Sequence, residues 1–139
     1  MIGLPGRLAV ADDGLEKWIE RYLDLAVRGV RSAEVQGKIA RHLQRFRLWI
    51  EAHERISAVT AREVTAWRGH LAAGVEQTAT GRATGMAPAT VNNHLAHVSA
   101  LFSWITAHAP AGLPPSGDPT KRVEPLRLPA PEVQHRSAP

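Results

Sequence analysis

The amino-acid sequence predicts an all-α protein. Four segments carry apolar residues at the spacing of a helix, and no segment of useful length alternates as a strand would. The chain has 139 residues, a length at which one domain is usual and a hydrophobic core forms without cross-links. Hydrophobic residues make up 44% of it and charged residues 22%, which is close to globular averages and argues against wholesale disorder. We therefore expect one compact bundle of four helices.

Two helices are predicted in the first half of the chain. The first runs from about Leu15 to Arg28, with acidic residues just before it and Gly29 as a natural C-terminal stop. The second begins after Ser32, a good N-cap, and reaches about His53. The expected core-facing residues are Leu15, Trp18, Ile19, Tyr22, Leu23 and Ala26 in the first helix, and Val35, Ile39, Leu43, Phe46 and Ile50 in the second.

Two further helices are predicted in the second half. Thr60 and Glu63 have the spacing of a capping box, which marks the start of the third helix. Pro88 fits the first position of a fourth helix, which continues to about His108. The glycine-rich stretch 74–85 between them has no apolar period and is expected to be a flexible loop. The expected core-facing residues are Val64, Trp67 and Leu71, followed by Val91, Leu95, Val98, Phe102 and Ile105.

The composition changes abruptly after Pro110, because most of the ten prolines lie beyond that point. We expect residues 111–139 to form a Pro-rich, extended and flexible linker or tail. The rest of the chain divides into an N-terminal arm, residues 1–11, and one helical domain, residues 12–110.

The sequence lacks the motifs of the common catalytic and metal sites. It has no cysteine, which removes thiol nucleophiles and cysteine zinc sites. His53 and Glu54 supply only half of a zinc-protease motif. His94 and His97 have no third ligand placed to complete a metal site, so we expect ordinary surface histidines. We therefore expect no catalytic residue, no metal, no cofactor and no small-molecule substrate.

Nothing in the sequence indicates a membrane protein. The longest apolar runs are a few residues, far short of the roughly 20 that span a bilayer. The segment from Met1 to Arg7 has no apolar stretch of the kind found in signal peptides. We expect a soluble, cytoplasmic protein without a membrane partner.

Positive charge is concentrated on the second predicted helix. The formal net charge is only +4, but residues 28–47 contain six basic residues and a single acid, Glu34. At 100° per residue, Lys38, Arg41 and Arg45 fall together on one flank of this helix. Such a ridge is suited to neutralising nucleic-acid phosphates, although an ordinary solvated face has the same spacing.

The fourth predicted helix carries polar side chains of a kind that can contact bases. Asn93 and His97 lie one turn apart on one polar face, and Asn92 lies with Ser99 and Ser103 on another. Asparagine can bond adenine through two hydrogen bonds, and serine can bond a base or a phosphate. Ordinary surface positions give the same pattern.

The four helices, the loop before the fourth and an Asp-Pro exit follow one another in a characteristic order. The residues are Phe46-x-x-Trp49-Ile50, then Ile56-x-x-Val59-Thr60-x-x-Glu63-Val64-x-x-Trp67-x-x-x-Leu71, then Ala87-Pro88-Ala-Thr90-Val91-Asn92-x-x-Leu95-x-x-Val98-x-x-Leu101-Phe102-x-Trp104-Ile105, then Asp118-Pro119. This pattern covers roughly residues 12–125 and resembles the N-terminal core-binding domain of the tyrosine recombinases, the phage-integrase family.

The resemblance implies a compact SAM-like bundle that forms one half of a C-shaped clamp around duplex DNA at a recombination site. Other recombinase protomers are possible partners in such an assembly. The catalytic residues of the family lie in a second domain, expected after this tail, so the module is expected to bind DNA without cleaving it. Tyr22, the only tyrosine, is expected in the core. The DNA-contacting residues that the resemblance implies are Lys38, Arg41, Arg45, Thr90, Asn92, Asn93 and His97, with Lys121 and Arg122 on the linker.

The fourth helix departs from the family pattern in two ways. The positions where arginine is frequent in the family hold Asn93, His94, Ser99 and Ser103 here, which weakens the attraction to phosphate. Ala87 replaces the usual serine N-cap. An alternative function is a helical protein-interaction module, or an integrase remnant, that associates with recombinase protomers through Trp49 or Trp104. A helix-turn-helix regulator is disfavoured because the predicted helices are long and no pair is joined by a short turn.

Overall fold

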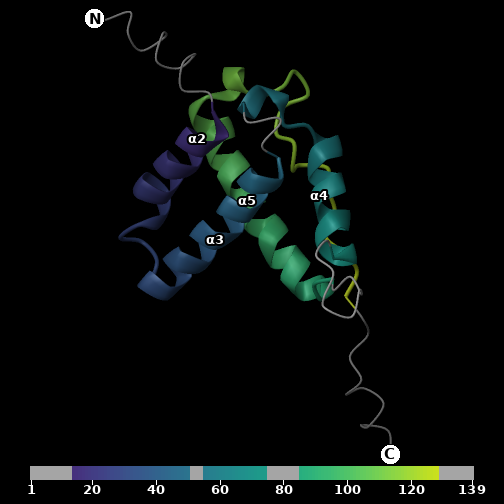
Figure 1. The fold of residues 1–139 in the computed structure, drawn as a ribbon. Helices are drawn as coiled ribbons and strands as arrows, with labels where there is room; N and C mark the ends of the chain where they lie inside the picture. Colours follow the sequence, from purple (N-terminus) through teal and green to yellow (C-terminus); the bar gives the residue numbers. More distant parts are fainter. Residues whose placement is uncertain (1–13, 51–54, 75–84, 129–139) are drawn as a thin grey trace, which may run out of the picture.

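A computed structural model describes residues 14–50, 55–74 and 85–128. Within these ranges the regular structure is helical, which confirms the all-α prediction (Figure 1). The predicted N-terminal arm, the last predicted turn of the second helix, loop residues 75–84 and residues 129–139 of the predicted tail lie outside them. In chain order the elements are α2 (Leu15–Tyr22), the π-helical turn η1 (Leu23–Val27), α3 (Ala33–Trp49), the 3₁₀ turn η3 (Ile56–Ala58), α4 (Ala61–Ala73), α5 (Pro88–His108) and the 3₁₀ turn η4 (Pro110–Gly112).

The first helix differs from its prediction in its last turns. From Leu23 onward the turn is widened, and the N–H of Arg28 donates to the carbonyl of Leu23 at 2.8 Å. A π-helical turn contains one extra residue, so the residues after it are shifted by one position. Val27 is therefore buried, at 2% exposure, in the place that a regular α-helix gives to Ala26. Gly29 then ends the element with a φ of +81°, which glycine adopts without strain.

The predicted starts of the other three helices are confirmed. The hydroxyl of Ser32 caps α3 by accepting the N–H of Val35 at 3.3 Å. Thr60 and Glu63 form the capping box of α4, in which the Glu63 carboxylate accepts the backbone N–H of Thr60 at 3.2 Å. Pro88 occupies the first turn of α5. Local signals of capping and backbone restriction therefore set where these helices begin.

α5 is the central helix and packs against α2, α3 and α4 (Figure 1). At the centre of the core, the ring of Phe46 from α3 lies 4.8 Å from Trp67 of α4 and 6.3 Å from Phe102 of α5, both edge-on. Aromatic pairs favour this geometry. The apolar stripes of α3, α4 and α5 supply most of the other buried side chains, which are Ile39, Leu43, Ile50, Val64, Leu71, Val91, Leu95, Val98, Leu101 and Ile105.

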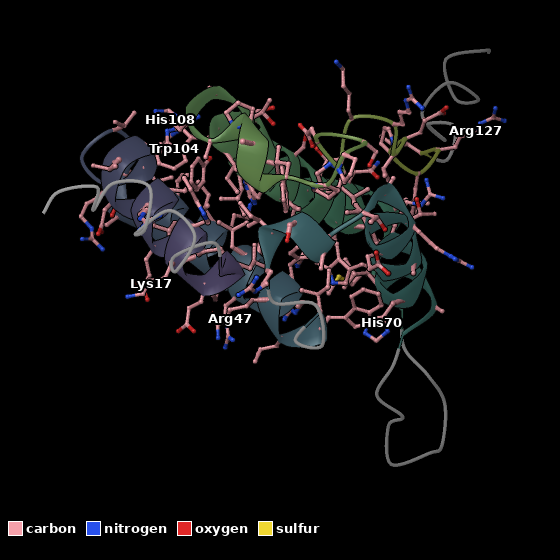
Figure 2. The ribbon with its side chains drawn as sticks, turned by 90° about the horizontal axis from the view of Figure 1, so that it is seen from above. Lys17, Arg47, His70, Trp104, His108 and Arg127 are labelled. Carbon is pink, nitrogen blue, oxygen red and sulfur yellow. The ribbon has the colours of Figure 1, made fainter. Side chains whose placement is uncertain are left out.

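A second aromatic group joins α2 to the C-terminal half of α5. The ring of Trp104 lies 5.9 Å from Trp18 and 5.8 Å from Tyr22, edge-on to each. It also stacks on His108 at 4.3 Å, one turn further along α5 (Figure 2). Tyr22 is buried, as predicted. The half-buried Trp104 therefore fills the space between these two helices.

The chain after η4 turns back along the bundle, between α4 and α5 (Figure 1). We call residues 113–128 the C-terminal strap. Leu113 and Thr120 are buried, and Arg68 of α4 donates to the carbonyl of Glu124 at 2.6 Å. The packed body therefore does not end at the predicted boundary after residue 110. Prolines are compatible with this packing because side chains, rather than a ladder of backbone N–H groups, hold the strap in place.

No helix of the described ranges is long and apolar enough to cross a membrane.

Candidate nucleic-acid interface

The basic ridge predicted on α3 is exposed. Lys38, Arg41 and Arg45 lie on the surface, whereas Ile39 and Leu43 between them point into the core. Spacings of three and four residues place the three cations on neighbouring rows of the helix. Lys38 and Arg45 occupy the flank nearest α5. Arg41 is exposed one turn before Arg45 and lines the same surface hollow as Arg45.

Three histidines join α3 to α5 next to this ridge. The ring of His42 from α3 stacks on His94 of α5, with centroids 3.6 Å apart and planes inclined by 14°. Its Nδ1 atom also lies 2.8 Å from Nδ1 of His97. His94 is 1% exposed and His42 8%, whereas His97 is half-buried. We call these three residues the histidine cluster.

The hydrogen bonds of His94 fix the position of its proton. Nδ1 lies 2.8 Å from the carbonyl oxygen of Thr90, which can only accept, so Nδ1 carries the hydrogen. Nε2 is then an acceptor and receives an N–H of Arg45 at 2.8 Å. Both ring nitrogens are therefore occupied, and neither has a lone pair left for a metal. No group of three side chains suited to holding a metal occurs among the described residues.

Burial and nearby positive charge keep the histidine cluster neutral. The pKa of His42 is lowered to about 3, chiefly by burial and then by the neighbouring histidines, Arg45 and Lys38. Burial is also the main cause that lowers the pKa values of the other two histidines. At His97 the charges of Lys38 and Arg31 add to this lowering of the pKa. The positive charge of this surface at neutral pH therefore comes from lysine and arginine.

The four predicted site residues of α5 have different surroundings. Thr90 and Asn93 are exposed on the first turns, and His97 belongs to the histidine cluster. Asn92 lies on the opposite flank, where its amide donates to the carbonyl of Leu126 at 3.0 Å and accepts the N–H of Leu126 at 2.7 Å. Both polar groups of Asn92 are engaged with the strap, so this side chain is not free to contact a base.

Lys121 and Arg122 are exposed on the strap. They follow Thr120, whose hydroxyl lies 3.4 Å from the hydroxyl of Ser99 on α5. Ser99 and His97 are two residues apart and point to opposite flanks of this helix. The structure therefore brings Lys38, Arg41 and Arg45 together with Thr90, Asn93 and His97, and leaves Lys121 and Arg122 on the other side of α5.

Comparisons with known proteins give no match for this chain. No family model matches it, and neither the search of curated proteins nor that of solved structures finds a counterpart. What the surface does is therefore inferred from its own residues.

Sequence reasoning missed His42 and misjudged His94. Helical spacing carries a signal for the first, because His42 lies four residues after Lys38 and three before Arg45, on the flank that faces α5. His94 lies three residues after Val91, inside the apolar stripe of α5. The expectation of an ordinary surface histidine is therefore wrong for His94, which is buried.

Proposed function

We propose that this chain is a DNA-binding module of the type found at the N-terminus of tyrosine recombinases, and that it binds duplex DNA without cleaving it. The observation that carries the proposal is the exposed ridge of Lys38, Arg41 and Arg45 beside the seam between α3 and α5. Thr90 and Asn93 extend this surface onto the first turns of α5. A row of cations neutralises phosphates and releases counterions, which drives DNA binding.

Few carboxylates oppose the charge of this surface. The 17 residues of α3 contain one acid, Glu34, and the 21 residues of α5 contain no Asp or Glu. Two of the three cations of the ridge are arginines, whose planar guanidinium groups match the geometry of phosphate. The surface therefore has both the charge and the donor geometry that a phosphate backbone needs.

The arrangement of the helices supports the finer architecture that we propose, a SAM-like core-binding bundle. α3 and α5 correspond to the second and fourth helices of the resemblance, and they pack directly against each other. In a clamp of this type both helices face the major groove of a recombination site. Lys121 and Arg122, which lie on the other side of α5, are not part of the surface that we propose. We also propose that other recombinase protomers are partners of this chain and that it is located in the cytoplasm.

The alternative of a protein-interaction module has less support. It requires accessible tryptophans, but Trp49 and Trp104 are both half-buried. The ring of Trp49 lies 5.4 Å from His70 of α4, and Trp104 packs on α2. Much of the surface of both rings is therefore buried in contacts within the bundle.

The test is fluorescence anisotropy of the full chain on a random-sequence duplex at several salt concentrations. The variant Lys38→Ala/Arg41→Ala/Arg45→Ala is expected to lose about 3 units of the log–log salt slope, since each lost phosphate contact removes about 0.9. The control removes the same charge from α2, α4 and the strap, with Lys17→Ala/Arg62→Ala/Arg127→Ala. Lys17 and Arg127 lie at opposite ends of the molecule (Figure 2).

The control variant is expected to keep most of the slope. Equal losses in the two triple variants contradict the proposal, because they indicate a non-specific response to net charge. Absence of binding by the unaltered chain at low salt also contradicts it, and favours the protein-interaction module.

A further inference from the structure

Arg45 reaches from α3 to α5, where its partner is an uncharged ring. Nη1 of Arg45 lies 2.8 Å from Nε2 of His94. We propose that His94 is a positioning residue, which holds the guanidinium of Arg45 ready for a phosphate without neutralising its charge. This inference rests on the proposed function and assigns a role within the same surface.

The ring of His94 is held from several sides. Its Nδ1–H donates to the carbonyl of Thr90 at 2.8 Å, which fixes the rotation of the ring. One face stacks on His42 at 3.6 Å, and the ring of Trp67 lies edge-on at 6.1 Å. The residue is 1% exposed, so neighbouring atoms surround it. Nε2 is therefore an acceptor with a fixed direction.

The absence of charge on this acceptor matters for binding an anion. A carboxylate would order an arginine but would also cancel much of its positive potential. The Nε2 atom of His94 accepts an N–H and leaves the charge of Arg45 whole. Guanidinium carries further N–H donors in the same plane, and Arg45 is exposed, so a phosphate can reach them from solvent. Ordering the side chain in advance also reduces the entropy lost on binding.

The surroundings favour the neutral form of His94. Burial lowers its pKa most, the bond to the carbonyl of Thr90 partly opposes this lowering of the pKa, and the charge of Arg45 adds to it. His42, which faces it from α3, is neutral at pH 7 as well, with a pKa lowered to about 3. Trp67, which faces it from α4, carries no charge. The acceptor is therefore present under the conditions of a binding experiment at neutral pH.

The test is a double-mutant cycle on DNA affinity at fixed salt. Arg45→Ala is expected to weaken binding about tenfold, as the loss of one charge-assisted hydrogen bond does. His94→Leu keeps a buried apolar side chain but removes the acceptor, and is expected to weaken binding by up to the same factor. In the Arg45→Ala background His94→Leu is expected to have no further effect. His94→Gln, whose amide can donate to the Thr90 carbonyl and accept from Arg45, is expected to restore most of the affinity.

The matched control is Arg41→Ala, because Arg41 is an equally exposed arginine of the same helix, whereas the bond to His94 is made by Arg45. In the Arg41→Ala background, His94→Leu is expected to weaken DNA binding by its full factor, so that the two fold-losses in affinity multiply. An equal effect of His94→Leu with and without Arg45 overturns the positioning role, because it indicates a contribution to packing alone. Failure of His94→Gln to recover more affinity than His94→Leu overturns it too.

A second measurement needs no DNA. In ¹⁵N NMR spectra of the folded chain, His94 is expected to carry its hydrogen on Nδ1, and the Nε2 resonance is expected to shift on Arg45→Ala but not on Arg41→Ala. This readout decides whether His94 holds Arg45 even if His94→Leu unfolds the chain. DNA binding with the expected salt slope but no Nε2 response contradicts the positioning role alone. Absence of binding with a clear Nε2 response contradicts the proposed function instead.

Discussion

His42 and His97 share a hydrogen bond across the contact between α3 and α5, with their Nδ1 atoms 2.8 Å apart. One of the two atoms donates and the other accepts, so the bond requires that at least one ring be neutral. If both rings become protonated, two donors face each other at this distance and the bond is replaced by repulsion. The contact between the two helices therefore depends on pH.

We predict that acid destabilises the fold before the carboxylates titrate. The pKa values of the cluster histidines are lowered in the folded chain, so the unfolded chain binds protons first as the pH falls below about 6.5. Stability is then complete above that pH and declines below it, by up to about 1.4 kcal/mol per pH unit for His42, whose pKa in the folded chain is lowered to about 3. Urea unfolding between pH 7.5 and 4.5 measures this slope.

The control for the pH experiment is the exposed His108. His108→Gln changes a histidine outside the cluster, and His42→Gln is expected to reduce the slope more than this control does. A slope that is the same in all three proteins would show that the cluster does not govern the acid response.

We predict that Asn92→Ala loosens the strap and lowers the free energy of unfolding by about 1 to 3 kcal/mol, because it removes two hydrogen bonds to Leu126. The neighbouring Asn93→Ala is the control, because Asn93 is exposed. It is expected to change stability by less than about 0.5 kcal/mol. Denaturant titration of the two variants measures the difference, and equal losses would contradict the structural role of Asn92.

We predict opposite effects of alanine at two glycines. Gly29 has a φ of +81°, so Gly29→Ala is expected to cost about 1 kcal/mol. Gly69 lies inside α4, where a Cβ atom meets nothing within 4 Å. Gly69→Ala is therefore expected to stabilise the fold by about 0.5 to 1 kcal/mol. Thermal unfolding of both variants checks the pair, and destabilisation by Gly69→Ala would be inconsistent with the free space described at that position.

We predict that Ala87→Ser stabilises α5. Ala87 has the extended backbone of an N-cap but no side-chain acceptor. A serine there can accept an N–H of the first turn, a gain of about 1 kcal/mol. Ala89→Ser, two residues inside the helix, is the control and is expected to give no gain. Chemical denaturation compares the two, and an equal gain at both positions would exclude capping as the cause.

The sequence predicts the helices well because their signals are local. The Thr60–Glu63 capping box and Pro88 each act within one turn, and each marks the observed start of a helix. The widened turn that buries Val27 in place of Ala26 has no comparable local signal. It depends on packing between α2 and the rest of the bundle, which periodicity along one segment does not contain.

The site is predicted less completely than the fold, and for a related reason. Exposure of Lys38, Arg41 and Arg45 follows from the spacing of one helix. The different surroundings of Asn92 and Asn93 do not follow from helical spacing. They depend on the strap, whose Leu126 lies 34 residues after Asn92 in the sequence and is hydrogen-bonded to Asn92. The histidine cluster likewise arises from two helices whose mutual placement only the tertiary structure gives.

The way in which the strap is attached also determines the order in which parts of the molecule unfold. Its bonds to Asn92, Arg68 and Ser99 all require α4 and α5 to be in place first. The centre of the core, in contrast, is the Phe46–Trp67–Phe102 group, which the helices form without the strap. The strap adds Leu113 to this core, with Val123 and Leu126 packed against it. Peeling of residues 113–128 is therefore an opening of lower free energy than global unfolding. We therefore expect two cooperative units, the strap, which opens locally, and the helical core, which unfolds only globally.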